Sequence, residues 1–86
     1  MKALLIYDIE DDRLRARVAT MCLDYGLQRI QYSAFFGEIS RNRQEEIVQR
    51  ISQQAGHKAL SVHLFPLCET DFKQRKSFII AKPKDT

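Results

Sequence analysis

The chain opens with an apolar run that ends in a carboxylate. Ala3 to Tyr7 has the length of a strand, and the extended pattern continues through Asp8 and Ile9 before further acidic residues follow. Because side chains alternate along a strand, both faces of this one are apolar until Asp8. Aspartate is uncommon within strands and costly to bury without a partner. The pattern predicts a strand that requires cover on both faces, with one acid to be explained at its end.

The next stretch has the spacing of an amphipathic helix. Asp11 or Asp12 provides its cap, it runs to about Tyr25, and Gly26 terminates it. The predicted core-facing residues are Leu14, Val18, Met21, Cys22 and Tyr25.

A second helix is predicted after Ser40 or Asn42, ending near Ala55 and before Gly56. Asn42 and Glu45 have the spacing of a capping box, with Asn in place of Ser or Thr. The predicted buried residues of this helix are Ile47, Val48, Ile51 and Ala55.

Extended segments flank the second helix. Leu27 to Ile39 is rich in aromatic and β-branched residues and is too long for one strand, so we predict a hairpin that reverses near Tyr32-Ser33. Gly37 within it indicates a bulge or a close approach by another group. Ala59 to Leu67 is the next strand, and Pro66 fits only near its end or on a sheet edge.

The elements follow the order strand, helix, two strands, helix, strand. Right-handed crossovers fold this order into an α+β, ferredoxin-like βαββαβ domain with a four-stranded antiparallel sheet and two helices on one face. We expect one domain over residues 1–82, with a core at 1–67, a polar linker at 68–77, a short C-terminal strand at 78–81 and a flexible tail at 83–86. The last strand would pair with its own sheet or with an exposed edge of another copy.

The two helices can cover only one face of this sheet. Both the first strand and Leu60 to Leu67 carry apolar residues on two faces. We therefore predict a homodimer that forms through the open sheet face.

Composition is that of an ordinary globular protein, with 44% apolar and 29% charged residues and a net charge of +3. This charge permits a polyanionic partner without requiring one. Cys22 and Cys68 form neither a metal motif nor a disulfide framework, and no leader or membrane-spanning stretch is evident. We expect a cytoplasmic protein without a membrane partner.

Two interpretations of Asp8 remain open. It either caps the following turn, or it meets its own copy across a twofold axis and shares a cation with it. Mg²⁺ suits such a pair because it binds one or two carboxylates and retains water for a phosphate substrate. His57 and His63 have no neighbour at metal-ligand spacing, which argues against zinc.

Arginine is concentrated in the first half of the chain. Such a bias usually marks a solvated basic face, although arginines also bind phosphates. Arg41 and Arg43 oppose the dipole of the second helix, which favours a phosphate-binding role. The candidate nucleic-acid-binding residues are Arg13, Arg15, Arg17, Arg41 and Arg43.

A set of short motifs, in combination, resembles the CRISPR-associated nuclease family Cas-two, the smaller of the two adaptation proteins. The match covers residues 2 to about 68. The motifs are Tyr7-Asp8-Ile9, Asp11-Asp12-Arg13, Tyr25-Gly26-Leu27, Gln31-Tyr32-Ser33-Ala34-Phe35-Phe36-Gly37 and Phe65-Pro66-Leu67-Cys68. At Phe36 this sequence differs from many members of the family, which have an acidic residue directly before the glycine that corresponds to Gly37.

The resemblance implies a homodimer in which Asp8 of each copy is the catalytic residue and holds Mg²⁺ or Mn²⁺. It implies endonuclease cleavage of phosphodiesters in RNA or double-stranded DNA, with Tyr7, Ser33 and Phe35 neighbouring the site. It also implies a scaffold role, in which the dimer bridges the larger CRISPR adaptation integrase during spacer acquisition.

Three other functions are compatible with parts of the sequence pattern. A non-catalytic nucleic-acid-binding scaffold would need only the arginines and the dimer. An RNA-recognition-like module shares the order of elements, but Ala34-Phe35-Phe36-Gly37 does not match its base-stacking strand. A small-ligand regulatory domain of the same fold is a further alternative.

Overall fold

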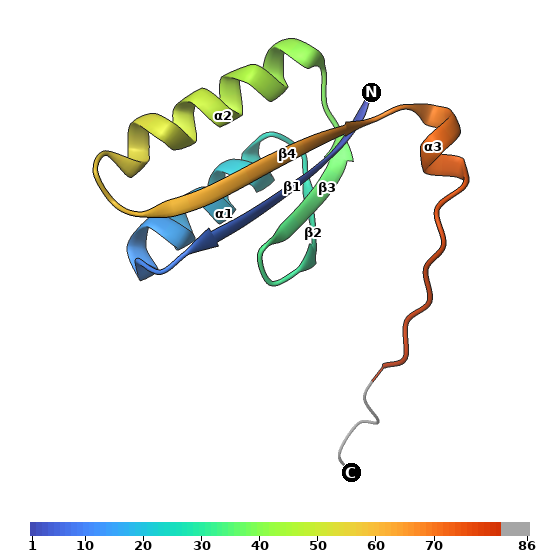
Figure 1. The fold of residues 1–86 in the computed structure, drawn as a ribbon, viewed down its shortest axis with the longest axis horizontal. Helices are drawn as coiled ribbons and strands as arrows, with labels where there is room; N and C mark the ends of the chain where they lie inside the picture. The colour runs from blue at the N-terminus through green and yellow to red at the C-terminus, as the bar shows by residue number, and fades with distance from the viewer. Residues whose placement is uncertain (82–86) are drawn as a thin grey trace.

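The computed structural model describes residues 1–81, and the predicted tail at 83–86 lies outside this range. The elements are β1 (Lys2–Ile9), α1 (Asp12–Asp24), β2 (Gln28–Gln31), β3 (Ala34–Glu38), α2 (Arg41–Ala55), β4 (Leu60–Leu67) and α3 (Glu69–Lys73) (Figure 1). The first six follow the predicted order.

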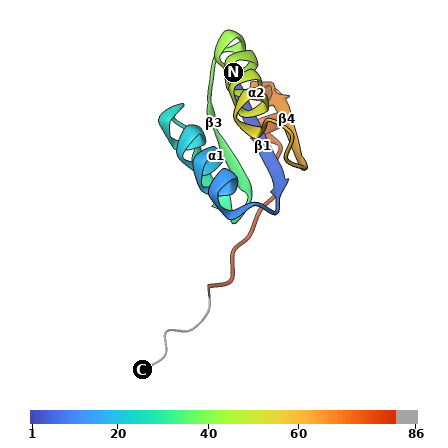
Figure 2. The ribbon, with the colours of Figure 1, turned by 90° about the vertical axis from the view of Figure 1, so that its left-hand side faces the viewer.

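The four strands form one antiparallel sheet in the order β2-β3-β1-β4. Both long helices lie on the same side of it (Figure 2). This confirms the ferredoxin-like fold and leaves the other face without a long helix, although α3 covers one end of it through the stacking of Phe72 on Phe36. No helix within residues 1–81 is long and apolar enough to cross a membrane.

Local signals explain the ends of the helices. The Asp11 carboxylate accepts a hydrogen bond of 2.8 Å from the Leu14 N–H and so caps α1. Gly26 follows with a φ of 84°, a conformation that favours glycine. At α2 the cap is Ser40, whose hydroxyl accepts from the Arg43 N–H at 3.3 Å. The alternative cap, Asn42, is wrong because it lies inside the first turn.

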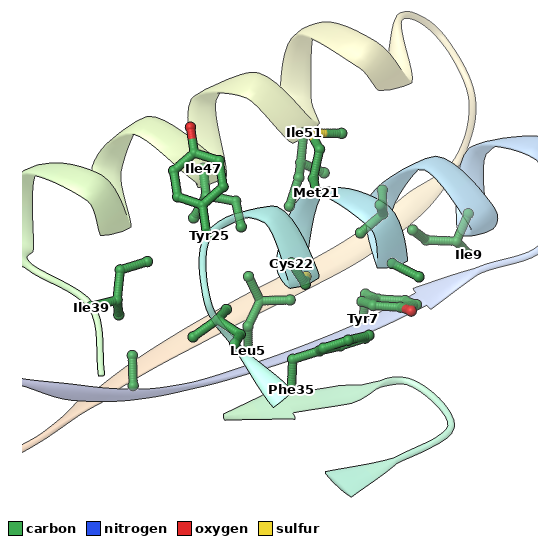
Figure 3. Packing of buried hydrophobic residues seen from close by; sticks show 14 of the residues in the cluster. Leu5, Tyr7, Ile9, Met21, Cys22, Tyr25, Phe35, Ile39, Ile47 and Ile51 are labelled. Atoms are coloured by element: carbon green, nitrogen blue, oxygen red, sulfur yellow. The ribbon is translucent and has the colours of Figure 1, made fainter. Parts of the chain in front are cut away.

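The core fills the space between the sheet and the two helices (Figure 3). The Tyr7 and Phe35 rings stack there, with centroids 6.1 Å apart. One predicted core position is wrong: Val48 is 41% exposed, whereas Gln44 is buried and donates its amide to the Ile39 carbonyl at 3.0 Å. That hydrogen bond satisfies the buried amide, so α2 can present Gln44 to the core.

The close approach indicated by Gly37 in the sequence is present in the structure, where the β3 backbone lies next to Gly26 and Leu27. A Cβ atom there would lie 3.1 Å from the Gly26 carbonyl oxygen and 3.3 Å from the Leu27 Cα. The β3 strand can therefore pass the α1–β2 connection only because residue 37 has no side chain.

The segment after β4 differs from the prediction. The expected linker contains α3, whose Phe72 ring stacks on Phe36 at 5.2 Å. Residues 78–81 form no strand in the single chain, and Phe78, Ile79 and Ile80 are 84%, 91% and 84% exposed. A strand requires a neighbour for its backbone hydrogen bonds, and this segment extends away from the sheet of its own chain (Figure 1).

Candidate nucleic-acid and metal site

Asp8 lies near the end of β1 and is exposed, on the strand face opposite to the helices. It stands across from Ser61 of β4 and lines a shallow pocket of about 240 Å³ together with Glu10, Ala59 and Leu60. Within residues 1–81 no hydrogen bond or ion pair engages its carboxylate. The Asp8 side chain therefore does not cap the following turn, a role that belongs to Asp11.

The acids that follow Asp8 have local roles. Asp11 caps α1 and forms an ion pair of 2.9 Å with Lys58. The hydrogen bond from Leu14 and the Lys58 ammonium both lower the pKa of Asp11. Asp12 pairs with Arg15. No group of three His, Cys, Asp or Glu residues suited to a metal is found in the described part of the chain. The carboxylates that line the pocket beside Ser61 are Asp8 and Glu10.

The open sheet face beside Asp8 is largely apolar. The register between the strands places Leu4 opposite both Phe36 and Phe65, and Ile6 opposite His63. The His63 ring stacks on Phe65 with centroids 6.1 Å apart, and Phe65 is 47% exposed. The chain thus presents a carboxylate at one end of an apolar surface, whose opposite end is covered by Phe72 of α3.

Tyr7, Ser33 and Phe35 surround the same strand end from its other side. The Tyr7 N–H donates to the Ser33 carbonyl at 3.0 Å, which attaches the β2–β3 turn to β1. Phe35 is fully buried beneath Tyr7. These residues position the strand next to Asp8, while their side chains lie away from its carboxylate.

The five predicted phosphate-binding arginines fall into two separate groups. Arg13, Arg15 and Arg17 lie on α1 near the Asp8 end, and Arg17 reaches Gln54 near the end of α2 at 3.0 Å. Arg41 and Arg43 begin α2 at the opposite end of the sheet, where the Arg43 guanidinium lies 4.5 Å from the centre of the Tyr25 ring. The structure does not bring the two groups together in one chain.

Two residues that the sequence prediction left out of the site line a pocket with Arg15. Arg29 of β2 and Tyr32 of the β2–β3 turn face α1 across a hollow of about 240 Å³, which Asp12, Ala16 and Ala19 complete. The concentration of arginines in the first half of the chain was a usable signal for Arg29. The pocket itself depends on how α1 packs beside β2, which no local pattern encodes.

Comparison with known proteins identifies the family. A family model described as "CRISPR associated protein Cas2" matches residues 1–75. The chain is 46% identical over 76 residues to a protein of Chloroflexus aurantiacus, covering 88% of this chain and 89% of the relative, and that protein is named CRISPR-associated endoribonuclease Cas2 2. A relative from Desulforudis audaxviator, named CRISPR-associated endoribonuclease Cas2, is 40% identical over 81 residues, which are 94% of this chain and 76% of the relative.

Solved structures and a fused relative agree with this assignment. Streptococcus pyogenes Cas2 at pH 6.5 superimposes with a TM-score of 0.74 at 25% identity, covering 91% of this chain and 99% of that one. A Thermoproteus tenax protein named as a fusion of endonuclease Cas1 and endonuclease Cas2 is 36% identical over 53 residues, 62% of this chain and 20% of the fusion. With its ferredoxin-like fold, its exposed Asp8 and a family match over residues 1–75, the chain belongs to the Cas2 family of CRISPR-associated proteins.

Proposed function

We propose that this protein is a metal-dependent endonuclease that cleaves phosphodiester bonds of RNA or double-stranded DNA, with Asp8 as the catalytic residue. The observation that carries this proposal is the free, exposed Asp8 carboxylate at the end of an apolar sheet face. The names of the relatives from Chloroflexus aurantiacus and Desulforudis audaxviator, both endoribonucleases, favour RNA as a substrate.

The active unit is proposed to be a homodimer. The apolar surface of Leu4, Ile6 and Phe65 requires cover, and a second copy packed on it brings two Asp8 side chains towards one axis. Two nearby carboxylates repel each other unless a cation or a proton lies between them. A homodimer of this kind would therefore require a cation or a proton between its two Asp8 carboxylates.

The residues present fit Mg²⁺ or Mn²⁺. The Asp8 oxygens are hard donors, and no protein cation neutralises them within residues 1–81. A bound divalent ion would supply Lewis-acid stabilisation of the phosphate and lower the pKa of a bound water. The chain contributes the carboxylate that holds the ion, the Tyr7–Ser33 hydrogen bond that fixes the strand end, and α1 arginines that bind the substrate backbone. Attack by water breaks the P–O3′ bond and leaves a 5′-phosphate and a 3′-hydroxyl.

Cleavage of end-labelled RNA and of duplex DNA tests the proposal. Asp8→Ala is expected to abolish cleavage by a folded protein, because Asp8 is exposed and carries no structural contact. EDTA should abolish wild-type cleavage, and Mg²⁺ or Mn²⁺ should restore it. Asp24→Asn, which removes an exposed carboxylate at the end of α1, is the matched control. Equal cleavage by wild type and Asp8→Ala, with and without EDTA, would refute the proposal.

A second proposed role is that of a scaffold for the larger adaptation integrase. The fused Thermoproteus tenax relative supports it, because one polypeptide there joins both components. The exposed arginines of α1 would contact DNA in this role. Charge reversal of Arg13 and Arg17 is then expected to abolish spacer acquisition, whereas Asp8→Ala leaves it intact. The opposite pattern in an acquisition assay would exclude the scaffold role.

A further inference from the structure

Helix α3 contacts the open sheet face of its own chain through one aromatic ring. The Phe72 ring stacks on Phe36 with centroids 5.2 Å apart and an angle of 12° between the planes. Phe36 follows the fully buried Phe35 in β3, so its side chain lies on the face opposite to the two long helices. The ammonium of Lys2, the first residue of β1, lies 4.9 Å from the centre of the Phe72 ring. Phe72 therefore covers the end of the open face at which the chain begins (Figure 1).

Charged side chains hold this ring in place from two sides. The Arg75 guanidinium lies 3.8 Å from the centre of the Phe72 ring and donates to the Phe72 carbonyl at 3.0 Å. Lys2 forms ion pairs of 3.1 Å with Glu38 of β3 and 4.0 Å with Glu69 of α3, and so links the sheet to the helix. Exposed ion pairs contribute little one by one, but here they act on a ring that is already stacked. The docking of α3 is thus specified by several side chains.

The opposite end of the open face is exposed to solvent. Asp8 and Ser61 stand across from each other there, and both are exposed. The next pair towards α3 on the same face is Ile6 and His63. The open face is therefore asymmetric along its strands, because one end is covered by the chain itself and the end that carries Asp8 is free.

We propose that Phe72 is a positioning residue that directs a second copy of the chain to the Asp8 end of the open face. Packed sheets lie about 10 Å apart, and the side chains of their facing surfaces fill the gap. A second sheet cannot pack on Lys2 and Phe36 while the Phe72 ring contacts them. The area left for an isologous contact is then the part of the face nearer to Asp8.

Both possible orientations of the second copy lead to the same contact. The twofold axis that relates two stacked sheets lies parallel to them. If it runs across the strands, the covered end displaces it towards Asp8. If it runs along the strands, the two α3 helices meet at the same end and hold the sheets apart, so the sheets come closest at Asp8. In either orientation Phe72 acts on the carboxylate pair without touching it.

The role of Phe72 rests on the homodimer of the proposed function, and it adds the element that aligns the two Asp8 carboxylates. A purely structural role for α3 would affect only the stability of the chain. Alignment of two copies is a separate quantity, and it can be measured as a distance between them.

Spin labels near the two ends of α2 report this alignment. His57→Cys places a label just after α2, near the Asp8 end of the sheet, and Asn42→Cys places one in its first turn, near the Lys2 end. Both positions are exposed and lie outside the open face. The distance between the labels of the two copies is measured by electron–electron double resonance for each position separately.

The background for both labels is Cys68→Ser. The Cys68 sulfur accepts the Asp71 N–H at 3.4 Å as the cap of α3, and a serine oxygen can accept the same hydrogen bond. Cys22 is buried and stays unlabelled. Metal and nucleic acid are left out, so the distances do not depend on cleavage.

Phe72→Ala is expected to shift the two distances in opposite directions. The distance between labels at position 57 should lengthen and that between labels at position 42 should shorten, because the second copy can then spread over the whole face. Phe72→Tyr retains the ring and should keep the distances found with Phe72. Thr70→Ala truncates an exposed side chain of the same helix and should also leave them unchanged.

Sedimentation and circular dichroism establish that each variant is a folded dimer. Unchanged distances in dimeric Phe72→Ala would overturn the proposal, and so would equal broadening of both distances, which indicates a looser dimer without a change of alignment. A monomeric wild type would overturn the homodimer together with the role of Phe72. Loss of cleavage in Asp8→Ala bears only on the nuclease activity, so the two proposals can fail separately.

Discussion

The Tyr7 N–H donates a 3.0 Å hydrogen bond to the Ser33 carbonyl, so the central strand and the hairpin turn are connected one residue before Asp8. This bond joins two surfaces with different chemistry. Tyr7 points its ring towards the helices, and Asp8 points its carboxylate towards the open sheet face. The candidate catalytic acid and the turn that carries Tyr32 therefore share one short piece of backbone.

Removing the Tyr7 hydroxyl should not destabilise the protein. Because the hydroxyl is buried without a partner, Tyr7→Phe is expected to leave the free energy of unfolding unchanged or to raise it. Denaturant unfolding of wild type and Tyr7→Phe measures the difference. Marked destabilisation would show that the hydroxyl already has a partner in the folded protein.

Gly37→Ala is expected to destabilise the protein by about 1–3 kcal/mol, the usual cost of overpacking. The new methyl group would meet the Gly26 carbonyl oxygen at 3.1 Å, and both groups belong to rigid backbone. Chemical denaturation measures the change. Gly56→Ala is a useful comparison, since open space surrounds a Cβ at that position and its cost would come from the φ of 59° alone.

The two cysteines should differ sharply in reactivity. Burial raises the pKa of Cys22 to about 12, so almost none of it is thiolate at neutral pH, and no reagent can reach it. Cys68 is exposed at the start of α3. A thiol-specific reagent should therefore label one cysteine in the native protein and two in denaturant. Rapid labelling of both in the native state would contradict the observed packing.

Acid should weaken the start of α1 through Asp11. Its pKa is lowered in the folded state by the Leu14 N–H and by Lys58, so its charge stabilises the fold at neutral pH. That contribution is present above the ordinary carboxyl pKa and is lost as the pH falls through the lowered value, below about pH 4. Asp11→Asn should thus lower the melting temperature at pH 7, and the difference from wild type should shrink as the pH is lowered below about 4. If the melting temperatures of wild type and Asp11→Asn differed by the same amount at every pH, the effect would come from the capping hydrogen bond and not from the charge of Asp11.

Self-association through the open face is tested by placing a charge there. Phe65→Glu is expected to give monomers at concentrations where the wild type sediments as a dimer, because the apolar surface would then bury an unpaired carboxylate. Val48→Glu, which adds the same charge on the exposed side of α2, is the matched control and should remain dimeric. Sedimentation that is identical for wild type and Phe65→Glu would exclude this face as the interface.

Much of the fold followed from local patterns. The caps at Asp11 and Gly56, the reversal at Tyr32-Ser33 and the alternation in β1 all depend on residues close together in the sequence. The exchange of Gln44 for Val48 in the core was not predictable, because hydropathy alone places an amide at the surface, and the hydrogen bond from Gln44 to the Ile39 carbonyl that permits its burial is known only from the structure.

The C-terminal segment and the pocket show the same limit in other ways. Helix α3 is short, and it is held by the stacking of Phe72 on Phe36 from a distant strand. The arginines of α1 were recognised from their spacing, but the approach of Arg29 and Tyr32 to Arg15 is a property of tertiary packing. Asp8 was identified because it interrupts an apolar strand, a signal that the sequence carries by itself.

The alternation of β1 also determines which kinds of genetic change this protein can tolerate. Tyr7 and Asp8 serve opposite faces of one strand, so deleting or inserting a single residue before them would exchange their sides. The carboxylate would then enter the core and the aromatic ring would enter the solvent. A single substitution in this strand alters either the core face or the open face. A shift of one residue exchanges the side chains of both faces, so the length of β1 is more strongly constrained than most of its side chains.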